Sequence, residues 1–358
     1  MNGRFRVACW GTGGVGKACL KEAMRLPEIE VVATLVYSEA KDGQDIGEIT
    51  GLPAYGVKAT RDREAVFATR PDAILYTPMD LGDWRTDDEI CELLRRGFNV
   101  ITSMPYQNLD VREPEVGKAI AQACLDGGST FHAAGVNPGF IVERLALAAT
   151  GGTNAITEIK VEEFVRIGTE PEETLKAFGF GIPPSPVAEK TPAAQIAENY
   201  ERQFIYFLGE AFGTPVKELR YTVDQRLAPR DLPAPTMTLP EGSVAYVSHR
   251  WEGITDGPSI VFYTYWYMSD AVMPDTPVPC EDYYVITIEG RPSMRIGVEL
   301  RASIADYRRT APGDTTVPVF YVTAVTMVQA IPSVIAASPG IKPIDTPSNG
   351  HWKADMRG

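Results

Sequence analysis

GTGGVGK, residues 11–17, decides the fold of the first part of this chain. Gly11, Gly13 and Gly16 fit the pattern G-x-G-x-x-G, which follows an apolar run of strand length and precedes apolar residues at helical spacing. In this context the first glycine permits a tight turn, the second lets the backbone approach a pyrophosphate, and the third lets the helix pack closely on the strand. The N–H groups at the helix start then face the phosphates. The predicted dinucleotide-binding residues here are Gly11, Thr12, Gly13, Gly14, Val15 and Gly16.

The same residues also fit the first seven positions of a P-loop, G-x-x-x-x-G-K. A P-loop continues with a Ser or Thr whose hydroxyl holds magnesium, whereas this chain has Ala18. The dinucleotide interpretation is therefore favoured over a nucleotide triphosphatase and over a purely structural turn.

Length and composition limit which classes of protein and partner remain possible. The chain has 358 residues, which suggests two domains, and its net charge of −13 argues against nucleic acid or an anionic membrane as the main partner. The five cysteines show no C-x-x-C spacing and the three histidines no metal-ligand spacing, so we expect reduced thiols and no metal. The basic start leads directly into a strand rather than a signal peptide, and the apolar stretch 324–337 is short for a membrane span. We expect a cytoplasmic protein.

Strands and helices alternate along residues 1–140. Apolar strands at 29–37, 73–76, 99–102 and 130–133 alternate with helices at 63–69, 83–96 and 114–125, which predicts a Rossmann-type parallel sheet domain. Ligands of such sheets lie over the carboxyl ends of the strands. The residues that follow two of these strands are therefore predicted to contact the cofactor: Thr77, Pro78, Met79, Ser103 and Met104.

The end of the second strand bears on cofactor choice. An NAD site has an Asp or Glu there for the ribose hydroxyls, whereas a 2′-phosphate needs that acid absent and a base present. Here Ser38 can donate a hydrogen bond and Lys41 can supply charge, while Glu39 lies one position late. We expect NADP, with NAD as the alternative; a solvated loop without ribose contact is the alternative for Lys41.

GVNPGF, residues 135–140, lies where the first domain is expected to end. Asn137 is pushed out of the helical region by the proline that follows it, and Pro138 suits the first turn of a helix over 140–149. We interpret this segment as a hinge, in which Asn137 and Pro138 contact the cofactor and Phe140 lines a substrate pocket. The alternative is an ordinary strand-to-helix turn.

Residues 141–320 are predicted to form a second, α+β domain with a largely antiparallel sheet. Alternating runs at 156–165, 244–251, 259–268, 283–289 and 294–301 indicate strands, with turns at 252–253 and 289–290. In the run 259–268, aromatic residues occupy both faces, so one face lines a pocket or both belong to the core. Residues 321–358, with helix on both sides of Pro332, are expected to pack back on the first domain.

A Gly- and Pro-rich excursion, residues 175–192, precedes a helix predicted over 194–212. Its Phe178 and Phe180 are candidates for the wall or lid of a substrate pocket. The alternative is a surface loop anchored by these two rings. The predicted buried stripe of the following helix contains Ile196, Tyr200, Phe207 and Ala211.

With the glycine loop, GVNPGF and a C-terminal sheet domain, the chain resembles the NAD(P)H-dependent amine dehydrogenases related to 2,4-diaminopentanoate dehydrogenase. These are similar in fold to dihydrodipicolinate reductase. The resemblance implies reductive amination of a small ketone or aldehyde with ammonia, with oxidative deamination of the amine as the reverse. It also implies a homodimer formed through the second-domain sheets.

Two departures from the family pattern affect the predicted chemistry. The chain lacks the His-His pair of dihydrodipicolinate reductases, and the loop at residues 103–107 lacks the Glu found in related amine dehydrogenases. We take Tyr106 and Gln107 as candidate catalytic residues near the reacting carbon, and Glu162 or Glu163 as a replacement acid. His132 is interpreted as a buried strand residue. A carbonyl or cyclic-imine reductase and a non-catalytic NADP-binding regulator remain alternatives.

Overall fold

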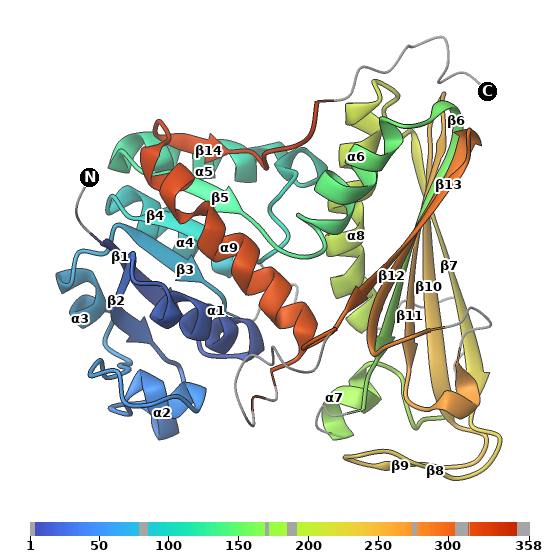
Figure 1. Cartoon of the computed structure of the whole chain (residues 1–358), viewed down its shortest axis with the longest axis horizontal. Coiled ribbons are helices and arrows are strands. Elements are labelled where there is room, and N and C mark those ends of the chain that lie inside the picture. Colours follow the sequence, from blue (N-terminus) through green and yellow to red (C-terminus); the bar gives the residue numbers. More distant parts are fainter. Residues whose placement is uncertain are drawn as a thin grey trace. The chain divides into compact units, whose positions relative to one another are not determined.

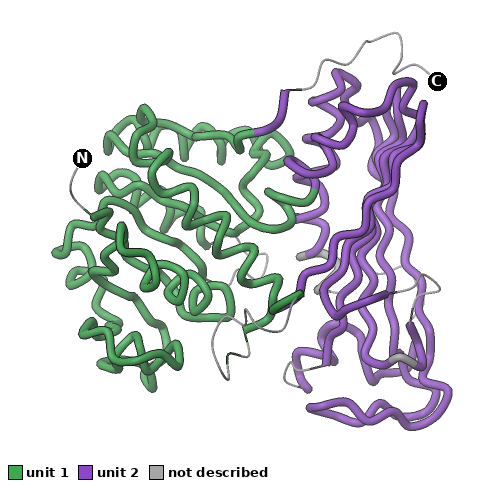
Figure 2. Tube along the Cα trace, in the orientation of Figure 1, with its two compact units in different colours: residues 1–141, 302–345 green, residues 142–301, 346–358 purple. Residues whose placement is uncertain are grey.

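The computed structural model describes residues 4–78, 85–168, 172–184, 192–273, 278–304, 314 and 316–348. Two compact units make up the chain (Figure 2). Unit 1 contains residues 1–141 and 302–345, and unit 2 contains residues 142–301 and 346–358.

Unit 1 is built on a six-stranded sheet in the order β14-β5-β4-β3-β1-β2, and every neighbouring pair in it is parallel (Figure 1). This confirms the predicted Rossmann-type sheet. Its strands are β1 (Phe5–Trp10), β2 (Ile29–Leu35), β3 (Ala73–Tyr76), β4 (Asn99–Thr102), β5 (Thr130–Ala133) and β14 (Gly340–Lys342).

The helices of unit 1 cover both faces of this sheet, because successive strand residues point to opposite sides. Val7 and Cys9 pack with α1 and α9 in one apolar core, whereas Ala8 and Trp10 pack with α3, α4 and α5 in the other. The helices are α1 (Gly14–Arg25), α2 (Ile46–Thr50), α3 (Arg63–Ala68), α4 (Thr86–Arg95), α5 (Pro114–Gly127) and α9 (Pro318–Ala336), with short 3-10 turns η1 (Glu39–Lys41) and η2 (Leu109–Val111).

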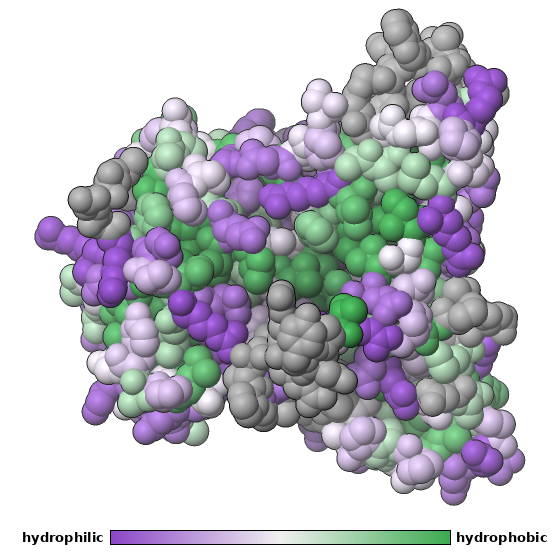
Figure 3. Space-filling model, viewed as in Figure 1, coloured by the Kyte–Doolittle hydropathy of each residue, from purple (hydrophilic) through white to green (hydrophobic). Residues whose placement is uncertain are grey.

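Helix α9 is longer than the apolar stretch that the sequence pattern picks out. It has 19 residues, and by length and composition alone it would suit a membrane span, so the expectation of a stretch too short for that is wrong. Met327 and Ile331 are nevertheless fully buried in the core that α9 shares with α1. Figure 3 shows apolar surface on the face of unit 1 along which α9 runs.

Unit 2 contains a six-stranded sheet in the order β13-β12-β6-β11-β10-β7. The β6–β11 pair is parallel and the other pairs are antiparallel, which confirms the prediction of a largely antiparallel sheet. Strand β7 was not expected from the sequence pattern. The strands are β6 (Asn154–Arg166), β7 (Glu218–Leu227), β10 (Val244–Ile254), β11 (Ser259–Tyr267), β12 (Asp282–Arg291) and β13 (Met294–Leu300), beside a small pair, β8 (Leu232–Pro233) and β9 (Thr238–Leu239).

Two predicted turns lie inside strands. The turns expected at 252–253 and 289–290 are wrong, because Gly253 belongs to β10 and Gly290 to β12. A Cβ at Gly253 would lie 2.6 Å from the Ile205 side chain, and one at Gly290 would lie 2.5 Å from that of Thr153. These glycines therefore permit close packing, and the chain reverses a few residues later.

The helical elements of unit 2 are short except for one. A π-helical segment (Ile141–Ala146) leads into α6 (Leu147–Thr150), where one continuous helix was predicted. The excursion predicted as a loop begins with α7 (Glu172–Ala177), and a 3-10 turn η4 (Asp270–Val272) follows β11. The long helix α8 (Pro192–Ala211) packs on β10 and β11, with the rings of Phe204 and Phe262 4.4 Å apart.

Candidate functional site

The glycine loop of unit 1 is compact because two of its glycines touch backbone. Gly11 has φ +102°, and a Cβ there would lie 2.8 Å from the carbonyl oxygen of Thr77. A Cβ at Gly16 would lie 2.3 Å from the carbonyl oxygen of Gly11. A side chain at either position would push β1, α1 and the loop after β3 apart. These contacts match the roles predicted for the first and third glycines.

Gly13, between them, borders open space. No atom lies within 4 Å of the position its Cβ would take, and no side chain caps the helix that follows. Lys17 donates to the Gly13 carbonyl oxygen at 2.9 Å, which is the first bond of the helical ladder. The N–H groups of residues 14–16 therefore have no acceptor within the helix, as expected of an anion-binding helix start.

The first turn of α1 is also in contact with α9. A Cβ at Gly14 would lie 2.3 Å from the ring of Phe320, so the helix start packs against that ring. Val15 is partly buried in the same core. Gly14 and Val15 can thus offer backbone N–H groups to a phosphate but have no room for a larger side chain at Gly14.

Thr77 joins the end of β3 to the glycine loop. Its N–H donates to the Trp10 carbonyl oxygen at 2.8 Å, and its hydroxyl donates to the same oxygen at 3.2 Å. Pro78 follows, with its nitrogen 3.3 Å from the position of a Gly11 Cβ. Both residues therefore lie beside the glycine loop, and their contact with the cofactor stays a prediction. Met79 lies outside the described residues.

The loop after β2 carries a lysine to the glycine loop. The Lys41 Nζ donates to the carbonyl oxygen of Thr12 at 2.9 Å and to its hydroxyl at 3.1 Å. Partial burial, and then the charge of Lys17, lower the pKa of Lys41. An anionic group beside Thr12 would relieve this repulsion between the two cations.

Both acids next to the 3-10 turn and Lys41 have a partner, and the Asp42 Oδ1 accepts from the Arg61 N–H at 3.1 Å. Glu39 forms an exposed ion pair with Arg61 at 3.0 Å. Ser38 is exposed at the start of the 3-10 turn, and its side chain caps nothing there. An exposed hydroxyl, an ammonium and a paired carboxylate therefore all follow the end of β2.

The loop after β4 contains residues 103–107. Ser103 is half-buried, whereas Met104 is 5% exposed and packs in the core beneath the sheet. The Met104 N–H donates to the Thr102 hydroxyl at 3.1 Å, which fixes the bend at the end of the strand. Ser103 is therefore the member of this pair whose side chain has access to a ligand.

Tyr106 has its hydroxyl engaged inside unit 1. It is 2% exposed, and its hydroxyl lies 2.9 Å from that of Thr86 and donates to Asp87. Arg112 lies over the ring and forms an ion pair with Asp87 at 2.7 Å. Burial, and then the charge of Asp87, raise the pKa of Tyr106. The hydroxyl thus holds the start of α4 against the loop, and a catalytic role for Tyr106 stays a prediction.

Gln107 and GVNPGF meet at the carboxyl ends of β4 and β5. The Gln107 Nε2 donates to the Pro138 carbonyl oxygen at 3.4 Å. The Gln107 Oε1 and the Asn137 Oδ1 are both buried and have no hydrogen-bond partner within the described part of the chain. Buried oxygens of this kind are normally satisfied, so they are candidate acceptors for N–H groups of a ligand. The half-buried Phe140 follows two residues after Pro138.

The turn of GVNPGF depends on Gly139. It has φ +131°, and a Cβ there would lie 2.6 Å from the Gly135 carbonyl oxygen. This tight turn places the side-chain amide of Asn137 and the carbonyl group of Pro138 at the end of β5.

These residues together fit a nicotinamide dinucleotide. Helix N–H groups without an acceptor in their own helix, with open space at Gly13, suit the pyrophosphate, and the ammonium of Lys41 lies beside Thr12 of the same loop. The two orphaned amide oxygens, Gln107 Oε1 and Asn137 Oδ1, suit the carboxamide at the far end of such a cofactor. All of them follow the carboxyl ends of unit 1 strands, as the topology predicts.

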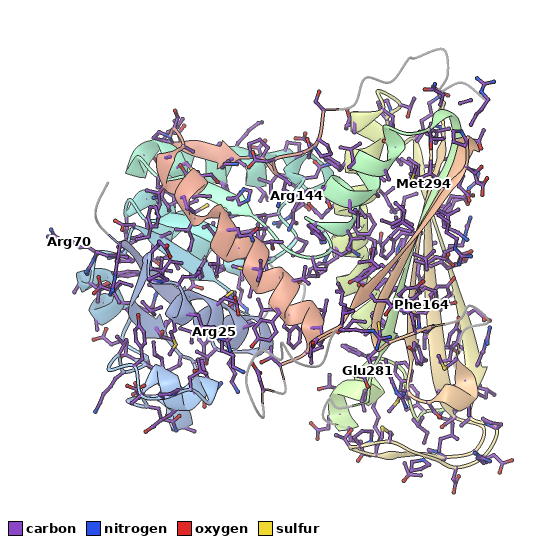
Figure 4. All side chains as sticks on the ribbon, viewed as in Figure 1. Arg25, Arg70, Arg144, Phe164, Glu281 and Met294 are labelled. Atoms are coloured by element: carbon purple, nitrogen blue, oxygen red, sulfur yellow. The ribbon has the colours of Figure 1, made fainter. Side chains whose placement is uncertain are left out.

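The predicted pocket aromatics belong to unit 2. Phe178 is half-buried, and its ring stacks on that of Trp266 at 5.4 Å. Phe180 is fully buried in the core of unit 2, which also contains Leu175 and Phe164 (labelled in Figure 4). In this structure Phe180 therefore has no surface to offer a ligand, whereas Phe178 has part of its ring exposed.

Neighbouring glutamates on β6 have different surroundings. Glu162 forms an ion pair with Lys160 at 3.3 Å and accepts from the Tyr265 hydroxyl at 3.1 Å. Glu163 points to the other face, where it accepts from the Tyr284 hydroxyl at 2.6 Å. The helix-covered face of the sheet thus contains a carboxylate.

Glu201 of α8 is a further buried acid that the sequence reasoning missed. It is 4% exposed, and burial, and then the charge of Glu163, raise its pKa well above the ordinary value. Its Oε2 has no partner within the described residues. The available signal was its helical spacing from apolar residues. The buried stripe of α8 is Ala197, Glu201, Phe204, Ile205 and Leu208, not the stripe predicted, in which Tyr200 and Phe207 are only half-buried.

His132 has a structural position. It is 1% exposed within β5, and its Nδ1 lies 2.9 Å from the Lys342 carbonyl oxygen of β14. Among the described residues no group of three or more His, Cys, Asp or Glu side chains is placed to hold a metal ion.

Comparison with known proteins shows a relationship along nearly the whole chain, although no family model matches it. An amine dehydrogenase of Streptomyces virginiae is 30% identical over 351 residues, covering 93% of this chain and 93% of that protein. The structure of amine dehydrogenase from Mycobacterium smegmatis matches with a TM-score of 0.74 and 21% identity over 98% of each chain. GenD2 from gentamicin A biosynthesis, in complex with NAD, matches with a TM-score of 0.53 and 12% identity over 95% of this chain and 90% of that one. The two structural matches show a shared fold.

Proposed function

The chain belongs to the amine dehydrogenase family, and from this premise we propose that it catalyses NAD(P)-dependent reductive amination of small ketones or aldehydes with ammonia. Oxidative deamination of the amine is the reverse reaction at the same site. The observation that carries this proposal is the dinucleotide cradle on β1 and α1, with open space at Gly13 and with N–H groups at residues 14–16 that have no acceptor within the helix. It gives the family's redox chemistry a place for its cofactor.

We propose NADP as the preferred cofactor, with NAD as the alternative. The support is the ammonium of Lys41 beside Thr12, the exposed hydroxyl of Ser38, and the pairing of Glu39 with Arg61. A 2′-phosphate gains a cation at this position, whereas the carboxylates that a 2′-hydroxyl would use, those of Glu39 and Asp42, are both engaged with Arg61.

The bound nicotinamide supplies the hydride, and the residues of the chain orient the reactants. Residues 14–16 would hold the pyrophosphate through their N–H groups, and Gln107 and Asn137 would accept hydrogen bonds from the carboxamide through their amide oxygens. The loop 103–107 contributes no acid, so much of the rate enhancement falls to orientation, which can supply ~7–11 kcal/mol of a barrier.

The proposal is tested by following NADPH oxidation with a panel of small ketones and aldehydes, with and without ammonium chloride at constant ionic strength. We expect turnover that requires ammonia. Absence of ammonia-dependent turnover across the panel contradicts reductive amination.

A second candidate function is reduction of a carbonyl or cyclic imine without ammonia. The absence of an acid from the loop 103–107 favours it, because such a reductase need not assemble an imine from ammonia. The same assay separates the two, since this activity persists when ammonium is left out. Tight NADPH binding without any turnover would instead favour a regulator.

We further propose a cytoplasmic homodimer formed through the sheets of unit 2, with small molecules as its partners and no nucleic acid or membrane. The support for the dimer is the face of that sheet opposite α8, where the rings of Tyr263 and Tyr265 stack 5.4 Å apart and both remain partly exposed. Aromatic surface of this kind is frequent at protein interfaces.

A further inference from the structure

A row of polar side chains crosses the face of the unit 2 sheet on which α8 packs. Strand register places His249 opposite Thr264, Thr264 opposite Glu163, and Glu163 opposite Tyr284, on the adjacent strands β10, β11, β6 and β12. We call these four residues the polar row. His249 and Thr264 are each 1% exposed, and Tyr284 is 2% exposed.

The neighbouring row of the same face is apolar. Two residues along each strand, it contains Trp251, Phe262, Val161 and Ile286. All four are buried, and Phe262 contacts Phe204 of α8. The polar row therefore interrupts a helix-on-sheet core, where apolar side chains would be expected, and burying polar groups there costs free energy unless they are satisfied.

Glu163 and Glu201 bring two carboxyl groups to this layer. Glu163 accepts from Tyr284 at 2.6 Å and from Thr264 at 3.1 Å. Glu201 lies on α8, and the negative charge of Glu163 contributes to its raised pKa. No cation of the described residues is bonded to Glu201. Its Oε2 is buried and unpartnered.

A second orphaned atom lies in the same row. The His249 Nδ1 is 2.8 Å from the Tyr221 hydroxyl, while its Nε2 is buried and has no partner within the described residues. Burial lowers the pKa of His249 to about 4, so the ring is neutral near pH 7 and contributes no positive charge. The Glu201 Oε2 is an unsatisfied buried carboxyl oxygen, and it is a candidate acceptor for the N–H groups of a positively charged ligand.

Glu162 provides the comparison on the opposite face. It is 6% exposed, and Lys160 supplies its counter-charge from within the chain. A buried carboxyl normally has such a partner. No cation of the described residues does this for Glu201, so we look to a ligand for the positive charge.

We propose that the polar row binds the protonated nitrogen of the substrate, as an ammonium ion or a small primary alkylammonium ion, with Glu163 and Glu201 as its carboxyl ligands. This proposal rests on the function proposed above, because it assigns the ammonium ion, one substrate of that reaction, to acids of unit 2.

The test measures binding directly and without turnover. The full-length protein is titrated with ammonium chloride and n-propylammonium chloride at constant ionic strength, and the shift in thermal midpoint and the heat of binding are recorded. We expect saturable binding to the wild type, which sodium and tetramethylammonium do not reproduce. Glu201→Gln should weaken this binding at least tenfold while leaving the affinity for NADPH unchanged, because an amide, unlike the carboxyl group, cannot lose a proton when the cation binds.

Glu210→Gln is the matched control, since Glu210 is exposed on the same helix and the chemical change is identical. Its affinity for both cations should equal that of the wild type. If Glu201→Gln fails to fold, Thr264→Val replaces it, removing one donor to Glu163 without changing a charge, and should also alter the cation affinity. Equal affinity in the wild type and the folded variant, or no cation-specific binding to the wild type, overturns the proposal.

The two proposals can fail separately. Ammonium binding that depends on Glu201, without amination of any carbonyl in the panel, contradicts the proposed function and leaves the site standing. Ammonia-dependent turnover with an unchanged KM for ammonia in Glu201→Gln contradicts the site and leaves the function standing.

Discussion

At the residue scale, Gly13 and Gly16 make different demands on the same loop. A Cβ at Gly16 would strike the Gly11 carbonyl oxygen at 2.3 Å, whereas a Cβ at Gly13 would meet no atom within 4 Å. Gly16 is therefore required by the fold, and Gly13 is required by what binds there.

We predict that Gly13→Val keeps its fold and loses cofactor binding. Gly13 has extended backbone, with φ −71° and ψ −164°, and open space where a Cβ would lie, but a valine side chain there would occupy the place of the pyrophosphate. Calorimetry should show at least a hundredfold weaker NADPH binding, with a thermal midpoint close to that of the wild type. Gly16→Val, in contrast, should unfold the domain, and unchanged NADPH affinity in Gly13→Val would contradict the placement of the cofactor.

Lys41 is expected to set the preference between the two coenzymes. Lys41→Ala removes the ammonium that lies beside Thr12, and a lost hydrogen bond to a charged group costs about 1.5–3 kcal/mol. The Kd for NADPH should rise by about 10–100-fold, with little change in the Kd for NADH. Lys118→Ala, at an exposed position on α5, is the control. Equal losses for both coenzymes would place the 2′-phosphate elsewhere.

His249 should make stability depend on pH. Burial lowers its pKa from 6.5 to about 4, so the unfolded chain binds the proton more tightly than the folded chain. The stability that the neutral ring provides is complete above pH 6.5 and is lost as the pH falls towards 4, by about 3 kcal/mol. Urea unfolding at pH 7 and pH 4 measures this. His249→Gln should lessen the difference by that amount, and an identical pH dependence in the variant would refute the assignment.

At the element scale, Asp314 links α1 to the start of α9. Its carboxylate accepts from Lys21 Nζ at 2.7 Å and from the Thr316 N–H at 3.0 Å, and Arg25 (labelled in Figure 4) approaches to 3.7 Å. Burial acts to raise the pKa of Asp314, but these hydrogen bonds and that from Tyr321 outweigh it and hold the pKa well below the ordinary 3.8.

Asp314→Asn should therefore destabilise the protein at neutral pH. The side chains of Lys21 and Asp314 are 10% and 3% exposed, and breaking a buried pair costs about 3–5 kcal/mol. Because the pKa is depressed, this stabilisation is present above pH 3.8 and is lost as the pH falls further, so the two proteins should converge in acid. Asp256→Asn, in the exposed pair with Lys217, should cost under about 1 kcal/mol. A similar loss in both variants at pH 7 would argue against the link.

Elements whose apolar residues recur with a regular period could be predicted from the sequence. Features that depend on packing against distant residues could not. The strands of unit 1 follow from apolar runs beside glycines, because a strand covered on both faces is apolar throughout. The turns at 252–253 and 289–290 were wrong, because glycine marks a turn locally but here leaves room for Ile205 and Thr153. The stripe of α8 was misassigned because an acid, Glu201, occupies its buried face.

At the scale of the whole molecule, the proposed homodimer uses the face of the unit 2 sheet opposite α8. Arg250 lies over the ring of Tyr263, which stacks on Tyr265. Tyr263→Asp would bury an unpaired charge in such an interface and should shift the mass in solution from twice 39.1 kDa towards 39.1 kDa. Light scattering after gel filtration measures this. Ala119→Asp, exposed on α5, is the control, and a dimer that survives Tyr263→Asp would place the interface elsewhere.

The sequence by itself determined the Rossmann-type fold of unit 1 and the position of its glycine loop. A glycine turn, a strand period and a helix start are local properties, because neighbouring residues set them. It also pointed to the family through GVNPGF and the order of elements. Tertiary structure alone decided which polar groups have no partner. Glu201 approaches Glu163 from 38 positions away, and Gln107 reaches Pro138 across 31, and no local pattern encodes either approach. Burial and pairing depend on how distant segments pack, so the candidate acids and acceptors became visible only in the folded chain.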